Sequence, residues 1–154
     1  MGIAEVKAFF AKEGIDNRIQ EFEVSSATVE LAAQALNCEP NRIAKSLSFT
    51  LKKQDKNIII VASGNARVDN KKFKAQFDDR AKMLAFDQVG EIIGHAAGGV
   101  CPFAVNAEVE IYLDISLKAY ETVFPACGSA NSAIELFLDE LEKYSNALTW
   151  VDVC

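Results

Sequence analysis

The side chains best suited to covalent chemistry lie close together in the second half of the chain. The stretch GHAAGGVCPFA, residues 94–104, holds the only histidine, His95, and one of the four cysteines, Cys101. A cysteine beside a histidine can act as nucleophile and base, because a thiol attacks only after it has become a thiolate. Spacing alone does not establish contact, and no cysteine-protease signature surrounds Cys101. A small buried hydrophobe is the alternative interpretation of this cysteine.

The same stretch could instead bind a ligand through its backbone. Gly98 and Gly99 have no side chains that would keep a ligand from their amides, and Pro102 fixes the exit of the loop. Such a loop can present N–H donors to an ester carbonyl or a carboxylate, as oxyanion sites do. A glycine turn made only for close packing fits the same residues. The strand, GxGxxG and helix order of a dinucleotide fingerprint does not surround them.

Lys45 interrupts an apolar pattern. It lies on the strand face that also carries Leu47, Phe49 and Leu51, where another apolar side chain is expected. A lysine in this position sits at a strand end, extends its stem to reach water, or points into a polar cleft. From the residues around Lys45 alone, extension of its stem to reach water is the default interpretation.

Two further groups of residues carry weaker signals. Gly128 and Ser129 begin a run of small and polar residues that is typical of a turn before a strand. The cysteines are widely spaced, contain no CxxC pair, and have only one histidine to complete a ligand set, so neither a metal site nor a cofactor is indicated. The cysteines are Cys38, Cys101, Cys127 and Cys154.

Charge is distributed unevenly along the chain. The net charge is −6, yet residues 41–82 carry a net +7, against −4 for residues 1–40 and −9 for residues 83–154. The middle segment could therefore face a phosphate backbone, although the whole chain is acidic. Lysines that are simply solvated on helix and hairpin surfaces are the alternative interpretation.

The positions of these residues depend on the elements that hold them, which hydrophobic spacing predicts. Ser26 or Thr28 is expected to cap one helix that Asn37 closes, and Asp69 is expected to cap the next. The predicted helices cover residues 2–14, 25–37, 68–77 and 86–94, with a last one ending near residue 145. The predicted strands cover residues 18–24, 42–52, 58–63, 108–117 and 121–129, with shorter ones after residue 131 and near residues 150–153.

Helices and strands do not alternate in a regular βαβ rhythm, which favours the α+β class over a doubly wound sheet. The length favours one domain over residues 1–154. No apolar run is long enough for a membrane helix, and the N-terminal residues do not form a signal peptide. Four reduced thiols in the cytoplasm are therefore expected, and no membrane partner.

Taken together, these segments resemble the YbaK/EbsC family, relatives of the editing domain of bacterial prolyl-tRNA synthetases. The resemblance rests on TVELAAQAL followed by PNRIAKSLSF, on IIIVASGNARVDNKKF, on GGVCPF and on CGSANSAIEL. GGVCPF matches the family's GxxxP loop, with Gly98 and Pro102 in the two defining places. Each motif is weak, but their order and separations over nearly the whole chain are specific.

The resemblance implies a compact mixed sheet, curled like part of a barrel around a pocket and flanked by helices. It implies deacylation in trans of a mischarged aminoacyl-tRNA, such as Cys or Ala on tRNA(Pro), by a positioned water and the substrate's own hydroxyl. Its partners would be the tRNA 3′ end and an aminoacyl-tRNA synthetase. The implied catalytic residues are Lys45, which would hold the tRNA terminus, and Gly98, which begins the loop through Pro102 that would hold the ester. The implied binding residues are Gly99, Val100, Cys101, Pro102, Phe103, Gly128 and Ser129.

Some residues depart from the family pattern and leave the substrate open. Ala104 follows Phe103 where the family often has glycine, and Asn65 stands where aspartate is common. A non-catalytic module that binds a tRNA 3′ end, a nucleotide or a small amino-acid-like ligand is the alternative. A metal-dependent enzyme is a third alternative, and it predicts that the purified protein contains stoichiometric zinc.

Overall fold

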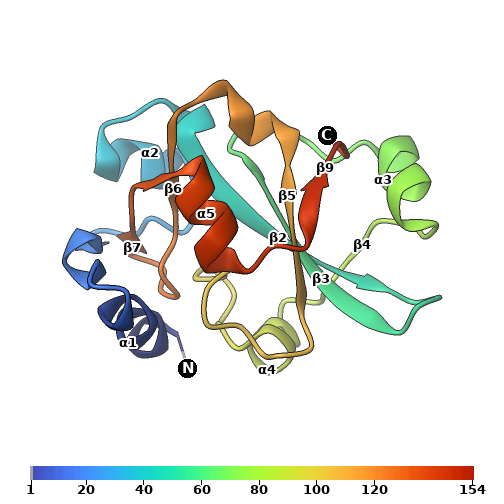
Figure 1. Ribbon diagram of the computed structural model, residues 1–154, viewed down its shortest axis with the longest axis horizontal. Coiled ribbons are helices and arrows are strands. Elements are labelled where there is room, and N and C mark those ends of the chain that lie inside the picture. The colour runs from blue at the N-terminus through green and yellow to red at the C-terminus, as the bar shows by residue number, and fades with distance from the viewer. Residues whose placement is uncertain (1) are drawn as a thin grey trace.

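The strand that carries Lys45 is the centre of the computed structural model, which describes residues 2–154 (Figure 1). β2 (Ile43–Leu51) and β3 (Lys56–Ser63) form an antiparallel hairpin in which Lys45 is opposite Ala62. β3 is buried from Ile58 to its end, as its unbroken apolar run predicts. The tip of the hairpin extends to one end of the molecule, beside α3 in the view of Figure 1.

The sheet is mixed, which confirms the predicted α+β class and its curled arrangement. β2 pairs in parallel with β6 and antiparallel with β4, and β3 pairs in parallel with β5. A separate two-stranded ladder joins β1 to β7. The sheet runs in the order β8 (Leu136–Phe137), β6 (Thr122–Pro125), β2, β3, β5 (Glu110–Asp114) and β9 (Thr149–Val151), with β4 (Lys82–Met83) also on β2; the ladder joins β1 (Gln20–Glu21) to β7 (Ser132–Ala133).

Two helices are capped by the residues that the sequence predicts. Thr28 accepts a hydrogen bond from Leu31 N, and Asn37 closes the same helix in the left-handed conformation. Asp69 caps the next helix through the amides of Lys71 and Lys72. The helices are α1 (Ile3–Lys12), α2 (Val29–Leu36), α3 (Asn70–Phe77), α4 (Val89–Ile93) and α5 (Leu138–Ser145), with 3₁₀ turns at Asp16–Arg18, Pro40–Arg42 and Ile115–Ala119.

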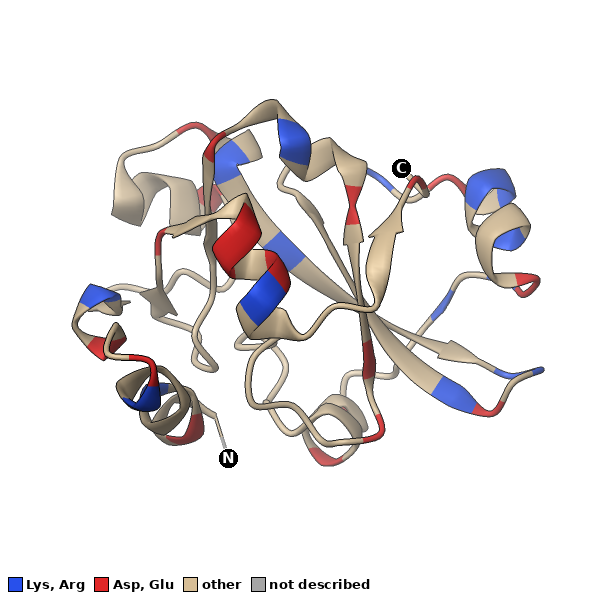
Figure 2. Ribbon diagram, viewed as in Figure 1, with Lys and Arg blue, Asp and Glu red and all other residues tan. Residues whose placement is uncertain are grey.

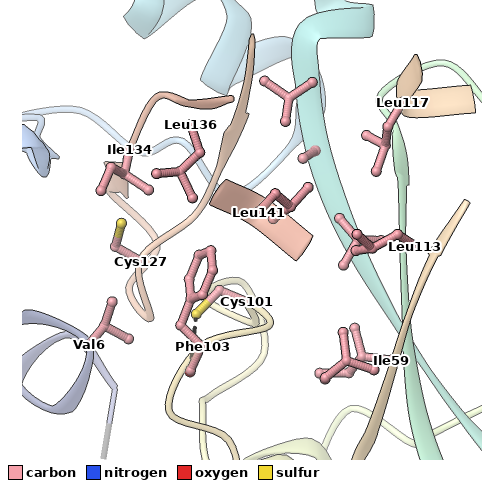
Figure 3. Packing of buried hydrophobic residues seen from close by; sticks show 14 of the residues in the cluster. Val6, Ile59, Cys101, Phe103, Leu113, Leu117, Cys127, Ile134, Leu136 and Leu141 are labelled. Atoms are coloured by element: carbon pink, nitrogen blue, oxygen red, sulfur yellow. Dashed lines mark hydrogen bonds between the residues drawn. The ribbon is translucent and has the colours of Figure 1, made fainter. Parts of the chain in front are cut away.

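Each face of the central hairpin borders its own core. On one face, Phe49 and Ile60 pack with Phe73 and Phe77 of α3. On the other face lies the larger cluster, which includes Phe103 and the residues drawn in Figure 3. The alternation of β2 therefore divides its side chains between two environments, and the odd-numbered face that carries Lys45 is the one toward α3.

Three strand predictions were too long, and the one over residues 121–129 is reduced to β6, Thr122–Pro125. The strand predicted over residues 108–117 ends at Asp114, because the Asp114 carboxylate accepts a hydrogen bond from Ser116 N and starts a 3₁₀ turn. Asp114 also does not face solvent with the other acids of this segment. It is buried and accepts a second hydrogen bond from Val153 N at 2.9 Å. The strand predicted over residues 18–24 is reduced to the two residues of β1.

Across residues 2–154, no helix combines the length and the apolar character that crossing a membrane requires.

Candidate functional site

One edge of β2 pairs with β3 along its whole length, but strand pairing on the opposite edge is interrupted. A cavity lies beside this interruption. On this edge β6 pairs with β2 only up to Ala44, and β4 pairs with it only from Phe49 onward. We call residues 45–48, which have no ladder partner on this side, the edge gap. A cavity of about 450 Å³ borders the edge gap and is also lined by residues of α2, of the loop before Val100 and of the segment after β4.

The walls of the cavity are formed largely by small side chains. Apolar atoms dominate small-molecule pockets, with a few polar groups that orient the ligand. Apart from Lys45, the polar side chains here are hydroxyls, among them those of Ser46 and Ser48 on β2 and Thr28 just before α2. Because the walls consist largely of methyl groups, they leave space for a compact ligand beside these hydroxyls. The alanines of the wall are Ala27, Ala32, Ala44, Ala97, Ala126 and Ala133.

Two large apolar side chains at the border of the cavity are open to solvent. Phe86 is 82% exposed and Met83 is 55% exposed, although both line the cavity. An aromatic ring left in water beside a pocket is available for stacking with the flat group of a ligand.

Lys45 is among the residues that line the cavity. Its ammonium donates hydrogen bonds to the carbonyls of Gly64, at 3.0 Å, and Ala66, which follow β3. Burial lowers the pKa of Lys45 below its usual value. An ammonium has three N–H donors, so one remains for a ligand after these two bonds are made.

Gly98 and Val100 are the members of the predicted GxxxP loop that line the cavity. Gly98 has φ +90°, a conformation that side chains disfavour, and a Cβ built on it would lie 3.7 Å from the methyl group of Ala27. Gly99 is buried and lies against the backbone of Ser129, where a Cβ would come within 2.8 Å of Ser129 Cα. The two glycines therefore have different roles. Gly98 gives the loop its conformation, and Gly99 allows the loop to pack against the turn at Ser129.

The other predicted binding residues support this loop from behind. Gly128 packs on the backbone of Gly2, and the Ser129 hydroxyl is hydrogen-bonded to Ser132 Oγ at 2.7 Å. Ser132 in turn lines the cavity. Cys101, Pro102 and Phe103 are buried and are not among the residues that line it.

His95 and Cys101 are in contact, but their surroundings prevent nucleophilic chemistry. Cys101 Sγ lies 3.5 Å from His95 Nε2, and His95 Nε2 is 2.6 Å from the carbonyl oxygen of Phe103. Both side chains are buried, and Figure 3 shows Cys101 in the larger core. Burial raises the pKa of Cys101 to about 12 and lowers that of His95. At neutral pH the pair is therefore a neutral thiol beside a neutral imidazole.

A run of shallow hollows leads from the cavity over the basic middle segment. Lys45 and Met83 border both the cavity and a second hollow, which Arg67 also borders. Ala81 continues this series to two further hollows. We call the series the basic track, and Figure 2 shows lysines and arginines gathered over α3, β4 and the tip of the β2–β3 hairpin. Its basic residues are Lys45, Lys52, Arg67, Lys74, Arg80 and Lys82.

Sequence reasoning missed the polar residues of the edge gap. Ser46 and Ser48 alternate with apolar residues on the strand, and this was the one signal in the sequence. Phe86 gave no signal, because a sequence does not tell an exposed phenylalanine from a buried one. Within residues 2–154, no group of three or more His, Cys, Asp or Glu side chains is placed to hold a metal ion.

Fold and site together define an α+β domain with a small pocket at an interrupted sheet edge. Residues 23–144 match the model of the aminoacyl-tRNA editing domain, and the chain belongs to this family. The resemblance to the YbaK/EbsC family is thereby confirmed.

Known relatives agree with this assignment. The chain is 49% identical to the uncharacterized protein YwhH of Bacillus subtilis (strain 168), covering 100% of this chain and 98% of YwhH. It is 26% identical, over 77% of this chain and 73% of the relative, to the "Putative Cys-tRNA(Pro)/Cys-tRNA(Cys) deacylase EbsC" of Enterococcus faecalis (strain ATCC 700802 / V583). A crystal structure described as a "putative trans-editing enzyme for prolyl tRNA synthetase" superimposes with a TM-score of 0.86 at 28% identity, covering 98% of this chain and 95% of the other.

Proposed function

We propose that this protein hydrolyses the ester bond of an aminoacyl-tRNA that carries a small amino acid, such as alanine, cysteine or serine on tRNA(Pro). The observation that carries this proposal is the cavity itself. Its walls of alanine suit a small side chain, and it is bordered by a lysine with one free N–H and by a glycine of positive φ. The name of the Enterococcus relative and the description of the similar crystal structure support the same class of reaction.

In this proposal Lys45 binds a phosphate of the terminal nucleotide through its remaining N–H. Gly98 holds the ester carbonyl through its amide, and Val100 borders the amino acid. Gly99, Gly128 and Ser129 hold the loop in this position. Cys101, Pro102 and Phe103 act indirectly, because they pack behind the loop.

The chemistry needs no protein nucleophile. A water molecule attacks the carbonyl carbon and loses a proton to the substrate's own hydroxyl. The bond from that carbon to the ribose oxygen breaks, and the oxygen leaves as a hydroxyl after taking up a proton relayed by the same group. The products are the free amino acid and the uncharged tRNA. Placing the water and the ester together can contribute about 7–11 kcal/mol to lowering the barrier. Such a mechanism agrees with the inert state of the buried His95 and Cys101 pair.

The basic track is the surface that we assign to the acceptor strand of the tRNA. Lysines and arginines along a groove bind a single strand through its phosphates. An aminoacyl-tRNA synthetase is the partner that would supply or receive such a tRNA in trans.

A panel of tRNA(Pro) charged with alanine, cysteine, serine or proline tests this proposal. We expect faster release of at least one small amino acid than in buffer, and a loss of about tenfold or more in Lys45→Ala. Lys12→Ala, which removes an exposed lysine of α1, is the matched control and should keep the wild-type rate. Hydrolysis at the buffer rate for every substrate would contradict the proposal.

A binding module without turnover is the second candidate. It is favoured by the two carbonyl partners that already hold the Lys45 ammonium, because such a lysine is positioned without being activated. Binding of a charged tRNA that Lys45→Ala abolishes, without any hydrolysis, would select this candidate.

A further inference from the structure

Ser46 occupies the middle of the edge gap with its backbone polar groups directed into it. In a strand, the N–H and C=O of one residue point to the same side, and the side alternates along the strand. Leu84 N donates to Ser48 O across the interrupted edge at 3.1 Å. Ser46, two residues before Ser48, therefore presents its N–H and C=O to the same edge, between the ends of β6 and β4.

The polar groups of Ser46 lack partners within residues 2–154. No ladder or loop hydrogen bond reaches its N–H or C=O, and its Oγ is buried without a hydrogen bond. A buried hydroxyl without a partner destabilises a protein, and such groups are rare enough in native structures to require an explanation. Ser46 lines the cavity, so a ligand there can supply the missing bonds.

We propose that Ser46 is a positioning residue that binds the aminoacyl group as if it were one residue of a missing strand. An α-aminoacyl ester has an amino group and a carbonyl group on the same α-carbon. Directly opposite residues of an antiparallel ladder exchange two N–H···O bonds. The amino group donates to Ser46 O. The ester carbonyl accepts from Ser46 N as well as from the Gly98 amide, because a carbonyl oxygen has two lone pairs. This inference rests on the proposed function and assigns one of its contacts.

The same arrangement orients the rest of the substrate. Side chains stand roughly perpendicular to a sheet, so the side chain of the amino acid leaves the strand edge toward the alanine walls. The hydroxyl of Ser46 is buried in the free protein, and a rotation about χ1 would turn it toward the attacking water. Recognition by strand addition obtains its affinity from main-chain bonds, which every amino acid can make. Selection among amino acids is then left to the walls of the cavity.

Amide hydrogen exchange measured by NMR tests the backbone contact directly. The probe is adenosine carrying L-alanine through a 3′-amide, which cannot be hydrolysed as an ester. We expect saturation with this probe to slow exchange of the Ser46 amide at least about tenfold. The Leu47 amide is the internal control. Its N–H points toward β3, where Leu47 is opposite Ile60, so its exchange rate should not change. A 3′-propionyl amide, which lacks the amino group, should bind at least about tenfold more weakly.

Two serine variants test the hydroxyl. Ser46→Ala removes a buried group without a partner, so we expect an unchanged or higher Tm together with a decrease of about tenfold in kcat/KM for deacylation. Ser63→Ala is the matched control on the neighbouring strand. Its hydroxyl is buried and bonded to Asn41 O at 2.6 Å, so its loss should lower Tm and leave kcat/KM as in the wild type.

The outcomes separate the two levels of the proposal. If the alanyl probe binds but exchange of the Ser46 amide is unchanged, the strand-like contact is wrong while the proposed function stands. Full kcat/KM in Ser46→Ala excludes the role of the hydroxyl. If no probe binds and no charged tRNA is hydrolysed, the proposed function fails, and the inference fails with it.

Discussion

At the scale of single residues, side chains that look reactive in the sequence differ from those that the fold exposes to a ligand. His95 and Cys101 are brought into contact, but inside a core that keeps both neutral. Lys45, by contrast, is tied to two carbonyls at the border of the cavity and keeps one donor. The residues that can contact a substrate are therefore those that border the cavity and still have a hydrogen-bond donor or acceptor without a partner.

The adjacent glycines of the loop provide a prediction at this scale. Gly99→Ala places a Cβ within 2.8 Å of Ser129 backbone atoms, so we expect a loss of about 1–3 kcal/mol in the free energy of unfolding, measured in urea. Gly98→Ala has space for its methyl group but must adopt φ +90°, which costs about 1–2 kcal/mol.

Activity should separate the two variants more clearly than stability does. Because Gly98 lines the cavity and Gly99 does not, Gly98→Ala should reduce deacylation more than Gly99→Ala, in buffer where both remain folded. Equal losses of activity would contradict the assignment of the ester contact to Gly98.

At the scale of elements, local patterns were sufficient for most helices and for the central hairpin. Thr28, Asn37 and Asp69 act as caps where the sequence places them, and the run from Ile58 forms a buried strand. The edge gap could not be predicted, because it depends on where two distant strands stop pairing with β2. The burial of Asp114 was missed for the same reason, since its partner Val153 is 39 residues away.

The cap of α3 predicts a pH dependence of stability. The amide of Lys72 is the main cause that lowers the pKa of Asp69 below 3.8, with the amide of Lys71 contributing. The carboxylate therefore stabilises the fold above the unfolded pKa near 3.8, and this contribution is lost as the pH falls through the lower folded pKa. Asp69→Ala should lower Tm at pH 7, and its difference from the wild type should shrink at lower pH.

Asp69→Asn is the control for this helix, because asparagine caps as well as aspartate but does not ionise. Its Tm at pH 7 should lie above that of Asp69→Ala. A difference between wild type and Asp69→Ala that stays constant from pH 7 to pH 2 would contradict the role of the charged cap.

At the scale of the whole molecule, the basic track reconciles an acidic protein with a polyanionic partner. The net charge of the chain is −6, but the positive residues of the middle segment gather over α3, β4 and the hairpin tip. The sequence revealed this segregation along the chain, while its continuity with the cavity required the fold. The neighbouring Lys52 lowers the pKa of Lys82, with burial and Arg80 adding to the effect. Mutually repelling cations of this kind are stabilised by an anion between them.

A charge-reversal pair tests whether the strand follows this track. The double variant Arg80→Glu and Lys82→Glu should weaken binding of a single-stranded RNA that ends in CCA. The slope of log K against log[salt] should become shallower by roughly 0.7 for each phosphate contact that is lost. The carboxylate of Asp79, also on the track, accepts hydrogen bonds from the amides of Lys53 and Arg80.

The matched control for this pair is the double variant Lys12→Glu and Lys143→Glu, on α1 and α5, which changes the net charge by the same amount. If RNA binding depends only on the overall field of the protein, both double variants weaken it equally and with the same change in slope. If the strand lies on the track, the control retains the wild-type slope, because no phosphate contact is removed. Equal slopes for the two double variants would therefore exclude the track as the path of the acceptor strand, even if the cavity still binds the aminoacyl end.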